Sequence, residues 1–110
     1  MRVIEKDQVD IFQVFQELTI KNTRDFREKM NRFLVESRKC LILDLQHVSY
    51  INSSALEIIA QAAIEARQNN QELVVAGIKP PIGEIFEIVK FAKVTRLFAT
   101  LEEAVDYYLQ

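Results

Sequence analysis

The sequence has few of the residues on which most small catalytic sites depend. It contains one histidine (His47), one cysteine (Cys40), two glycines (Gly77 and Gly83) and no tryptophan among 110 residues. A P-loop or a dinucleotide-binding loop needs several glycines within one strand-to-helix turn, so two separated glycines exclude both. One histidine and one cysteine cannot complete an ordinary tetrahedral zinc site. We therefore expect no metal and no cofactor.

An excess of one charge and long hydrophobic runs are also missing. The 14 basic and 16 acidic residues give a formal net charge of -2, and scattered basic residues predict no attraction to nucleic acid or anionic membranes. No apolar run approaches the roughly 20 residues that span a bilayer, and the N-terminal MRVIEKDQ lacks the apolar core of a signal peptide. We expect a cytoplasmic protein in which Cys40 is a small buried hydrophobic residue. Its oligomeric state is not predicted.

What the sequence does contain is a regular alternation of strand and helix patterns. Residues 1–5 and 9–15 alternate as strands do, and the polar Lys6-Asp7-Gln8 between them predicts an antiparallel pair. Short apolar runs predict further strands at 41–45, 73–76 and 96–99. Helical spacing predicts helices at 24–37, at 54–69, from Pro81 to about 90, and after Thr100, where Glu103 completes a capping box.

This order of elements, ββαβαβαβα, predicts one α/β domain over residues 1–110. The sheet should be mostly parallel, with an N-terminal antiparallel hairpin and about four helices. We expect two helices to bury the following apolar residues: Leu56, Ile59, Ala60, Ala63 and Ile64 in the helix at 54–69, and Ile82, Ile85, Phe86 and Val89 in the helix after Pro81.

The loop after the strand at 41–45 is the candidate site, because α/β sheets bind ligands and partners at the carboxyl ends of their strands. It reads QHVSYINSSAL and places two adjacent serines at a predicted helix start. Ser54 followed by Glu57 fits a capping box, a purely structural role worth about 1 kcal/mol. A phosphate on Ser54 would also lie near free backbone N–H groups and the positive end of the helix dipole, which stabilise anions.

The chain resembles the STAS domain of bacterial anti-sigma-factor antagonists over essentially its whole length. The segments that carry the resemblance are LILDL, HVSYINSSALEII, ELVVAGI, KPPIGEIFEIVKFAKVTRLF and TLEEAV. The resemblance implies a partner switch, in which the unphosphorylated antagonist binds an anti-sigma factor that is also a serine kinase. Phosphorylation of a loop serine ends that binding, and a phosphatase restores it.

On this resemblance Ser54 is the phosphorylated serine, and Ser53 is the second choice. The partner-binding face that it implies consists of Ile51, Asn52, Ser53, Ser54, Leu56 and Glu57.

A STAS interaction module without phosphorylation, or an accessory subunit of a larger complex, is an alternative. Asn52, Ala55 and Glu57 stand where the family has an aspartate, a glycine and, in many members, a second glycine. Since the Glu57 carboxylate follows Ser54 by three residues, it would repel a phosphate placed there.

An enzyme is a further interpretation, because Asp44, His47 and Ser53 or Ser54 have the residue types of a nucleophilic triad. The glycine-flanked elbow that exposes a nucleophilic serine is absent. We therefore expect a non-enzymatic protein.

Overall fold

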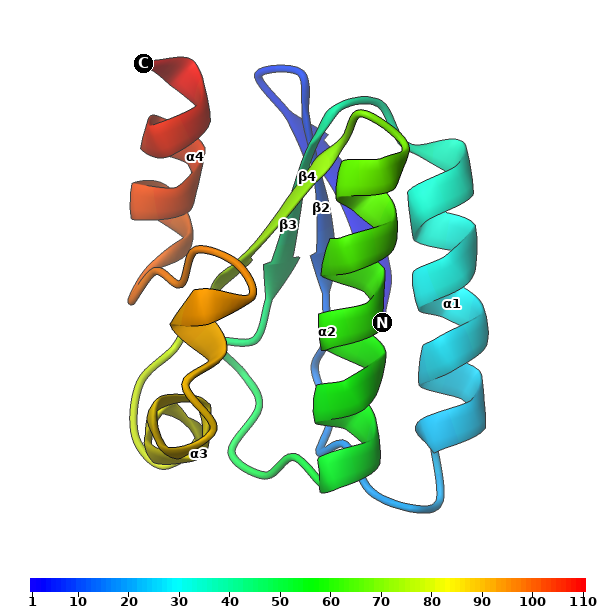
Figure 1. Ribbon diagram of the computed structural model, residues 1–110, viewed down its shortest axis with the longest axis vertical. Coiled ribbons are helices and arrows are strands. Elements are labelled where there is room, and N and C mark those ends of the chain that lie inside the picture. Colours follow the sequence, from blue (N-terminus) through cyan, green and yellow to red (C-terminus); the bar gives the residue numbers. More distant parts are fainter.

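The computed structural model describes all of residues 1–110 and contains a four-stranded sheet with helices on both faces (Figure 1). In chain order the elements are β1 (Arg2–Lys6), β2 (Val9–Gln13), α1 (Thr23–Glu36), β3 (Cys40–Asp44), α2 (Ser53–Gln68), β4 (Glu72–Ala76), α3 (Ile82–Ile88), a 3-10 turn (Phe91–Lys93) and α4 (Leu101–Leu109). The strands lie in the order β1-β2-β3-β4, with β1 antiparallel to β2 and the other pairs parallel. The predicted α/β class, N-terminal hairpin and four helices are confirmed.

Both faces of the sheet bury apolar side chains. On one face Phe12 and Leu43 belong to a large core that α1 and α2 cover, and on the other Ile11 and Ile42 pack in a smaller core beneath α4. Neighbouring residues of a strand point to opposite faces, so a strand covered on both sides must be apolar at almost every position. This is why β3 has a nearly continuous hydrophobic sequence.

The turn between β1 and β2 contains only two residues. Asp7 and Gln8 have φ values of 55° and 67°, as the two central residues of a type I′ hairpin turn require. The hairpin is also tied to the segment before β3, because the Arg38 backbone N–H donates to Asp10 Oδ2 at 2.9 Å and its guanidinium donates to Asp10 Oδ1 at 3.2 Å.

The strand predicted at 96–99 is wrong. This segment makes a single parallel bridge between Leu97 and Val75, supported by a 2.8 Å hydrogen bond from the Phe98 N–H to the Val75 carbonyl. A further hydrogen bond joins the Ile78 N–H to the Phe98 carbonyl at 3.0 Å, and two residues later Thr100 caps α4, where its hydroxyl oxygen accepts the Glu103 N–H at 3.1 Å. The predicted cap at Thr100 is therefore confirmed.

The buried face of α2 agrees with the predicted one in part, since Ile59 and Ala63 are buried as predicted and Leu56 and Ala60 are half-buried. It consists of Ala55, Ile58, Ile59, Ala62, Ala63 and Ala66, whereas Ile64 is 38% exposed. Small alanine side chains allow the helix to approach its neighbours closely, and the packing turns Ile58, Ala62 and Ala66 inward and Ile64 outward.

The helix α3 is shorter and more exposed than predicted. Its seven residues bury only Ile82 and Phe86, while Ile85 is 37% and Val89 52% exposed. A helix of two turns at the rim of the sheet has neighbours on one side only, so its remaining apolar residues face solvent.

The helix α4 is fastened to the sheet through two tyrosines. The Tyr108 hydroxyl lies 2.9 Å from the Leu41 carbonyl oxygen and 2.7 Å from that of Glu72, and the Tyr107 hydroxyl lies 2.9 Å from a Glu72 carboxylate oxygen. Burial, followed by the nearby Glu72 carboxylate, raises the pKa of Tyr108. Neutral phenol groups thus connect the last helix to β3 and β4.

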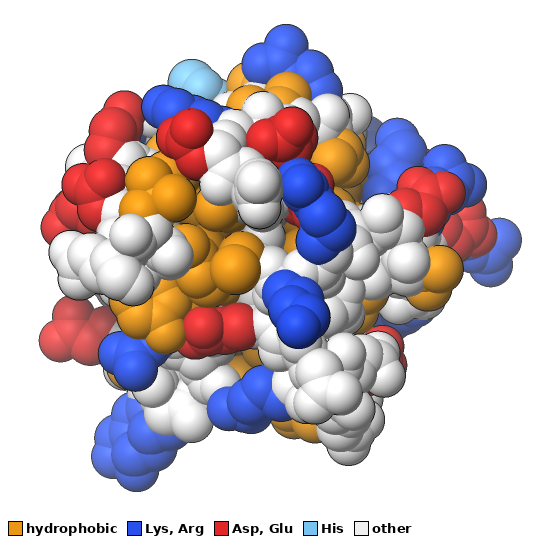
Figure 2. All heavy atoms as spheres, turned by 90° about the horizontal axis from the view of Figure 1, so that it is seen from above, with side chains coloured by type: hydrophobic (Ala, Val, Ile, Leu, Met, Phe, Trp, Pro, Cys, Tyr) orange, Lys and Arg blue, Asp and Glu red, His pale blue; other side chains and the backbone are white.

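Figure 2 looks onto the end of the molecule that carries the C-terminus and the β1–β2 turn, both at the top of Figure 1. Basic and acidic side chains are interspersed on this end, around one patch of hydrophobic atoms. None of the helices is both long and apolar enough to cross a membrane.

The end of β4 comes so close to the loop after β3 that only glycine fits at position 77. Gly77 has a φ of +78°, and a Cβ atom there would lie 2.3 Å from the Gln46 backbone nitrogen. The left-handed conformation and the close backbone contact both disfavour any side chain.

We predict that Gly77→Ala lowers the free energy of unfolding by more than about 1 kcal/mol, because the alanine would strain φ and clash with the backbone. Gly83→Ala is the matched control, since a Cβ atom at that position would meet its nearest neighbour at 3.7 Å. The control should leave stability unchanged or raise it slightly. Urea denaturation of both variants checks this, and equal stability of the two would contradict the proposed constraint.

Candidate functional site

The candidate site is the connection from the carboxyl end of β3 to the first turn of α2. In Figure 1 it lies at the lower end of the molecule, together with the connection between β2 and α1 and the helix α3. These segments meet there because β2, β3 and β4 are parallel and end at the same edge of the sheet.

The start of the loop is fixed by Asp44, whose side chain is buried with 1% exposure. Its carboxylate accepts hydrogen bonds from Gln13 Nε2, Gln46 Nε2 and the Gln46 backbone N–H, each at 3.1 Å. The Arg2 guanidinium donates in turn to Gln13 Oε1 at 2.9 Å. Asp44 therefore holds the loop in place, since a buried carboxylate is stable only when hydrogen-bonded.

The middle of the loop is paired with the segment that follows β2. Leu18 and Ile51 form a parallel bridge, in which the Leu18 N–H donates to the Tyr50 carbonyl and the Asn52 N–H donates to the Leu18 carbonyl, both at 3.0 Å. Leu18 and Ile51 are 1% and 2% exposed. The bridge therefore continues the pairing of β2 with β3 beyond the strands themselves.

Glu17 adds a second link between the same two segments. Its carboxylate accepts the Ser49 backbone N–H at 3.1 Å and the Ser49 hydroxyl at 2.8 Å. Ser49 thus has a structural partner, unlike the two serines that follow it.

The residue that caps α2 is Asn52, so the capping box predicted for Ser54 and Glu57 is wrong. The Asn52 side-chain oxygen accepts the Ala55 N–H at 2.8 Å, and the helix begins at Ser53. Ser54 is the second residue of the helix, where its hydroxyl has no capping role. The sequence allowed both cap positions, and the bridge at Ile51 selects the earlier one.

The side chains of Ser53 and Ser54 are exposed, and none of the side-chain hydrogen bonds at this helix start, which are those of Asn52, involves either hydroxyl. Both lie in the first turn of α2, which contains no acidic residue and in which the free N–H groups favour an anion. Glu57 is exposed one turn later and forms no ion pair. The two serine hydroxyls are therefore available to a partner or a modifying enzyme.

The other predicted contact residues occupy different environments. Ile51 is buried and supports the loop from inside, Asn52 and Leu56 are half-buried, and Leu56 packs against the large core. The accessible part of the predicted face is therefore formed by the polar residues Ser53, Ser54 and Glu57.

Sequence reasoning missed the exposed apolar residues on the segments at this edge of the sheet. Ile20 in the connection before α1 is 88% exposed, Tyr50 in the loop is 52% exposed and Ile88 on α3 is 76% exposed. They come from three segments that share the carboxyl edge of the sheet. The predicted parallel order of the strands is the one sequence signal that could have assigned these three segments to the same edge of the sheet.

The triad residues are not assembled. Asp44 is held by two glutamines, and the exposed His47 stacks on Phe15 with ring centroids 5.2 Å apart. No group of three or more histidine, cysteine, aspartate or glutamate side chains is placed to hold a metal ion. Cys40 is half-buried at the first position of β3 and packs beside the smaller core.

We predict that Asn52→Ala lowers the free energy of unfolding by about 1 kcal/mol, because the Ala55 N–H loses its partner. Ser54→Ala, one position into the helix, should change stability by less than about 0.5 kcal/mol. Asn52→Asp should lose less stability than Asn52→Ala, since a carboxylate caps equally well and favours the helix dipole but cannot replace the amide that donates to Thr23 Oγ1 at 3.4 Å. Chemical denaturation of the three variants checks this. If Ser54→Ala lowers the free energy of unfolding more than Asn52→Ala does, Ser54 and not Asn52 caps the helix.

Comparison with known proteins agrees with this geometry. Over 93 residues the chain is 28% identical to an anti-sigma-B factor antagonist of Listeria monocytogenes, a match that covers 84% of this chain and 81% of the relative. It is 37% identical over 54 residues to BtrV of Bordetella bronchiseptica, which is assigned as an anti-sigma factor antagonist, but that match spans only 49% of this chain and 47% of BtrV.

The fold is shared with a crystal structure of an anti-sigma factor antagonist from Mycobacterium paratuberculosis, at a TM-score of 0.90 and 20% identity. The superposition covers 99% of this chain and 92% of that one. Residues 1–104 match the STAS domain family. Since this match includes every strand, the candidate loop and the start of α4, the chain belongs to the STAS domain family.

Proposed function

We propose that this protein is an anti-sigma-factor antagonist, which binds an anti-sigma factor through the surface around the first turn of α2 and is released when Ser54 is phosphorylated. The observation that carries the proposal is the exposed Ser54 hydroxyl, which has no partner within the protein and lies at an anion-tolerant helix start. The relatives named as anti-sigma-factor antagonists support the same role.

Phosphorylation at this position would change the surface and leave the fold intact. The cap depends on Asn52 and not on Ser54, and a phosphate with a charge of about -1.5 to -2 would lie beside the positive end of the helix dipole. The exposed Tyr50 and Ile20 lie on neighbouring segments. A charged group among such residues must be desolvated when a partner covers them, which costs binding free energy.

The chemistry belongs to the partner. In the proposed step a serine kinase, which is the anti-sigma factor itself, transfers the γ-phosphoryl group of ATP to Ser54 Oγ. ADP leaves, and the hydroxyl proton passes to a base of the kinase. A phosphatase reverses the modification by hydrolysis. The protein itself acts by binding in the cytoplasm and catalyses no reaction.

An interaction module without phosphorylation remains the second candidate, and Glu57 is the observation that favours it. Glu57 is exposed, forms no ion pair and follows Ser54 by three residues on the helix. Residues three apart on a helix are neighbours, so its carboxylate would oppose a second negative charge.

We predict that the cognate kinase and ATP add one phosphate to the wild-type protein and none to Ser54→Ala. Ser53→Ala is the matched control, because it removes the neighbouring exposed hydroxyl and should still accept the phosphate. Intact-mass measurement of all three proteins checks this. If Ser54→Ala is modified and Ser53→Ala is not, Ser53 is the phosphorylated residue.

The same assay separates the two candidate functions. If the wild-type protein binds the kinase but gains no phosphate from it, the proposal that phosphorylation controls binding is wrong. If Glu57→Gln then became a substrate, the carboxylate would be the reason, and the natural chain would be an interaction module.

We also predict that Ser54→Asp weakens binding to the anti-sigma factor at least about tenfold, since it places a charge within the binding surface. Its melting temperature should stay within about 3 °C of the wild-type value, because an acidic residue is favourable in the first turn of a helix. Isothermal titration calorimetry and thermal denaturation check the two statements. An unfolded Ser54→Asp protein would show instead that position 54 is structural.

A further inference from the structure

The outer strand of the sheet is open to solvent along one side. β1 pairs only with β2, so its other edge presents backbone N–H and C=O groups without strand partners. Its sequence is RVIEK, and Val3 is 56% exposed. The charges of Glu5 and Lys6 protect one end of the strand from unwanted pairing, but Val3 and Ile4 lack such protection.

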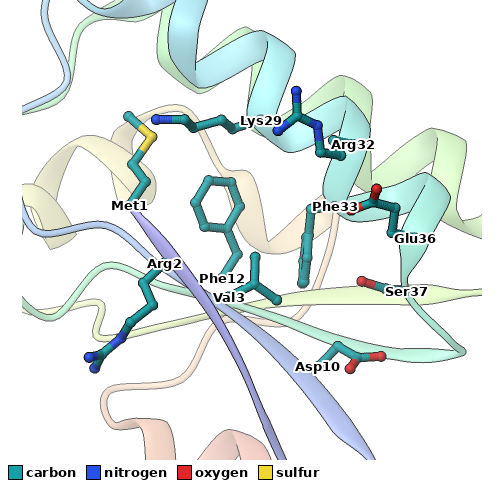
Figure 3. A pocket seen from close by; sticks show the side chains of 10 residues that line it. All are labelled: Met1, Arg2, Val3, Asp10, Phe12, Lys29, Arg32, Phe33, Glu36 and Ser37. Atoms are coloured by element: carbon teal, nitrogen blue, oxygen red, sulfur yellow. The ribbon is translucent and has the colours of Figure 1, made fainter.

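A groove with a volume of about 350 Å³ runs between this strand and α1 (Figure 3). It exists because Phe26 and Phe33 of α1 pack on Phe12 of β2, which leaves the outer strand uncovered. The rings of Phe12 and Phe33 lie beneath it, with centroids 5.4 Å apart, but they are only 1% and 2% exposed, so the accessible apolar side chains of the groove are those of Val3 and the partly buried Met1. Val3 stands opposite Phe12 in the strand register, so both side chains point to this face of the sheet.

The rim of the groove has opposite charges at its two ends. Figure 3 shows the Lys29 ammonium extending toward Met1, the Arg32 guanidinium nearer the middle of the groove, and Glu36 and Asp10 at the other end. Arg32 forms no ion pair, and Lys29 pairs only with the exposed Asp25 at 2.9 Å.

Two other charged lining residues are already engaged. Asp10 is bonded to Arg38. Arg2 lines the groove, but its guanidinium points away from the two phenylalanines and donates to Gln13. The cationic groups left for a partner are therefore Arg32, which is unpaired, and Lys29, whose partner Asp25 is exposed.

We propose that this groove binds an extended segment of a partner protein, which adds to β1 as a fifth strand. One apolar side chain of the segment lies on the exposed Val3, and an acidic side chain lies near Arg32 or Lys29. In strand addition the backbone hydrogen bonds provide affinity and the groove selects alternate side chains. None of the lining residues belongs to the loop at 46–57, so this surface is separate from the Ser54 site.

A second copy of the chain fits this edge poorly. The register that pairs all five residues of β1 with an antiparallel copy is centred on Ile4 and places Arg2 opposite Lys6. Like charges directly opposite each other in an antiparallel pair are destabilising. The cationic rim is also complementary to an acidic segment and not to the basic ends of β1.

Titration of the isotope-labelled protein with three capped eight-residue peptides, followed by NMR, tests the proposal. The first peptide alternates valine with threonine and carries two aspartates. It is made in two versions, one with the aspartates at the N-terminal end and one with them at the C-terminal end. The second has lysines in their place, and the third has N-methylated central residues. We expect at least one acidic version to shift the amides of β1, Arg32 and Phe33 saturably, and both control peptides to bind at least roughly fivefold more weakly.

Arg32→Glu should weaken the acidic peptide roughly fivefold or more. Arg27→Glu should weaken it less than twofold, because this exposed arginine of α1 lies outside the groove. No saturable shift at millimolar peptide, shifts confined to other elements, or equal losses in the two variants would each overturn the proposal. If the β1 amide signals shift as the protein concentration rises without peptide, and sedimentation shows a dimer, the edge of β1 binds a second copy of the chain instead.

Discussion

The candidate site depends on a single parallel bridge between Leu18 and Ile51. Two backbone hydrogen bonds hold the segment after β2 against the loop after β3, and both bridge residues are buried. Because the bridge fixes Ile51, the next residue is placed to cap α2 through its side chain. The two serines then follow in the first turn with their hydroxyls in solvent. The bridge and the capping side chain of Asn52 thus act together at the start of the helix.

The function that we propose follows from this division of roles. Asp44, Glu17 and Asn52 carry out the structural work of the loop through hydrogen bonds, which leaves Ser54 free of any. A hydroxyl that stabilises nothing can be modified without loss of the fold. It lies among segments that expose Ile20, Tyr50 and Ile88, so a charge added there would act on a partner rather than on the protein. The STAS family membership and the named relatives agree with such a role.

The distribution of helices over the sheet explains why two different surfaces are available. Three parallel strands end at one edge, where their connections build the Ser54 site. The antiparallel β1 lies outside the cover of α1 and leaves a groove above Phe12 and Phe33. The first surface would respond to phosphorylation. The second is built from other elements, so binding there need not compete with the switch.

Several sequence predictions failed where a choice depended on neighbours distant in the chain. The segment at 96–99 has strand character, but it makes only one bridge before the cap at Thr100. In α2 the predicted Ile59 and Ala63 are buried, but close packing against the sheet and α1 turns Ile58, Ala62 and Ala66 inward in place of Ile64. Ser54 and Asn52 are both good caps by residue type, and the Leu18–Ile51 bridge determines which one serves.

The sequence by itself determined the α/β class, the order of the strands and helices except the last strand, the cap of α4, and the location of the candidate loop. These features depend on local periodicity, capping chemistry and turn residues, which are properties of neighbours in the chain. The tertiary structure alone decided that Asn52 caps α2, that Ile51 is buried, that Gly77 must approach Gln46, and that a groove opens beside β1. Each of these depends on contacts between segments far apart in sequence, whose distances are set by packing and which no local pattern specifies.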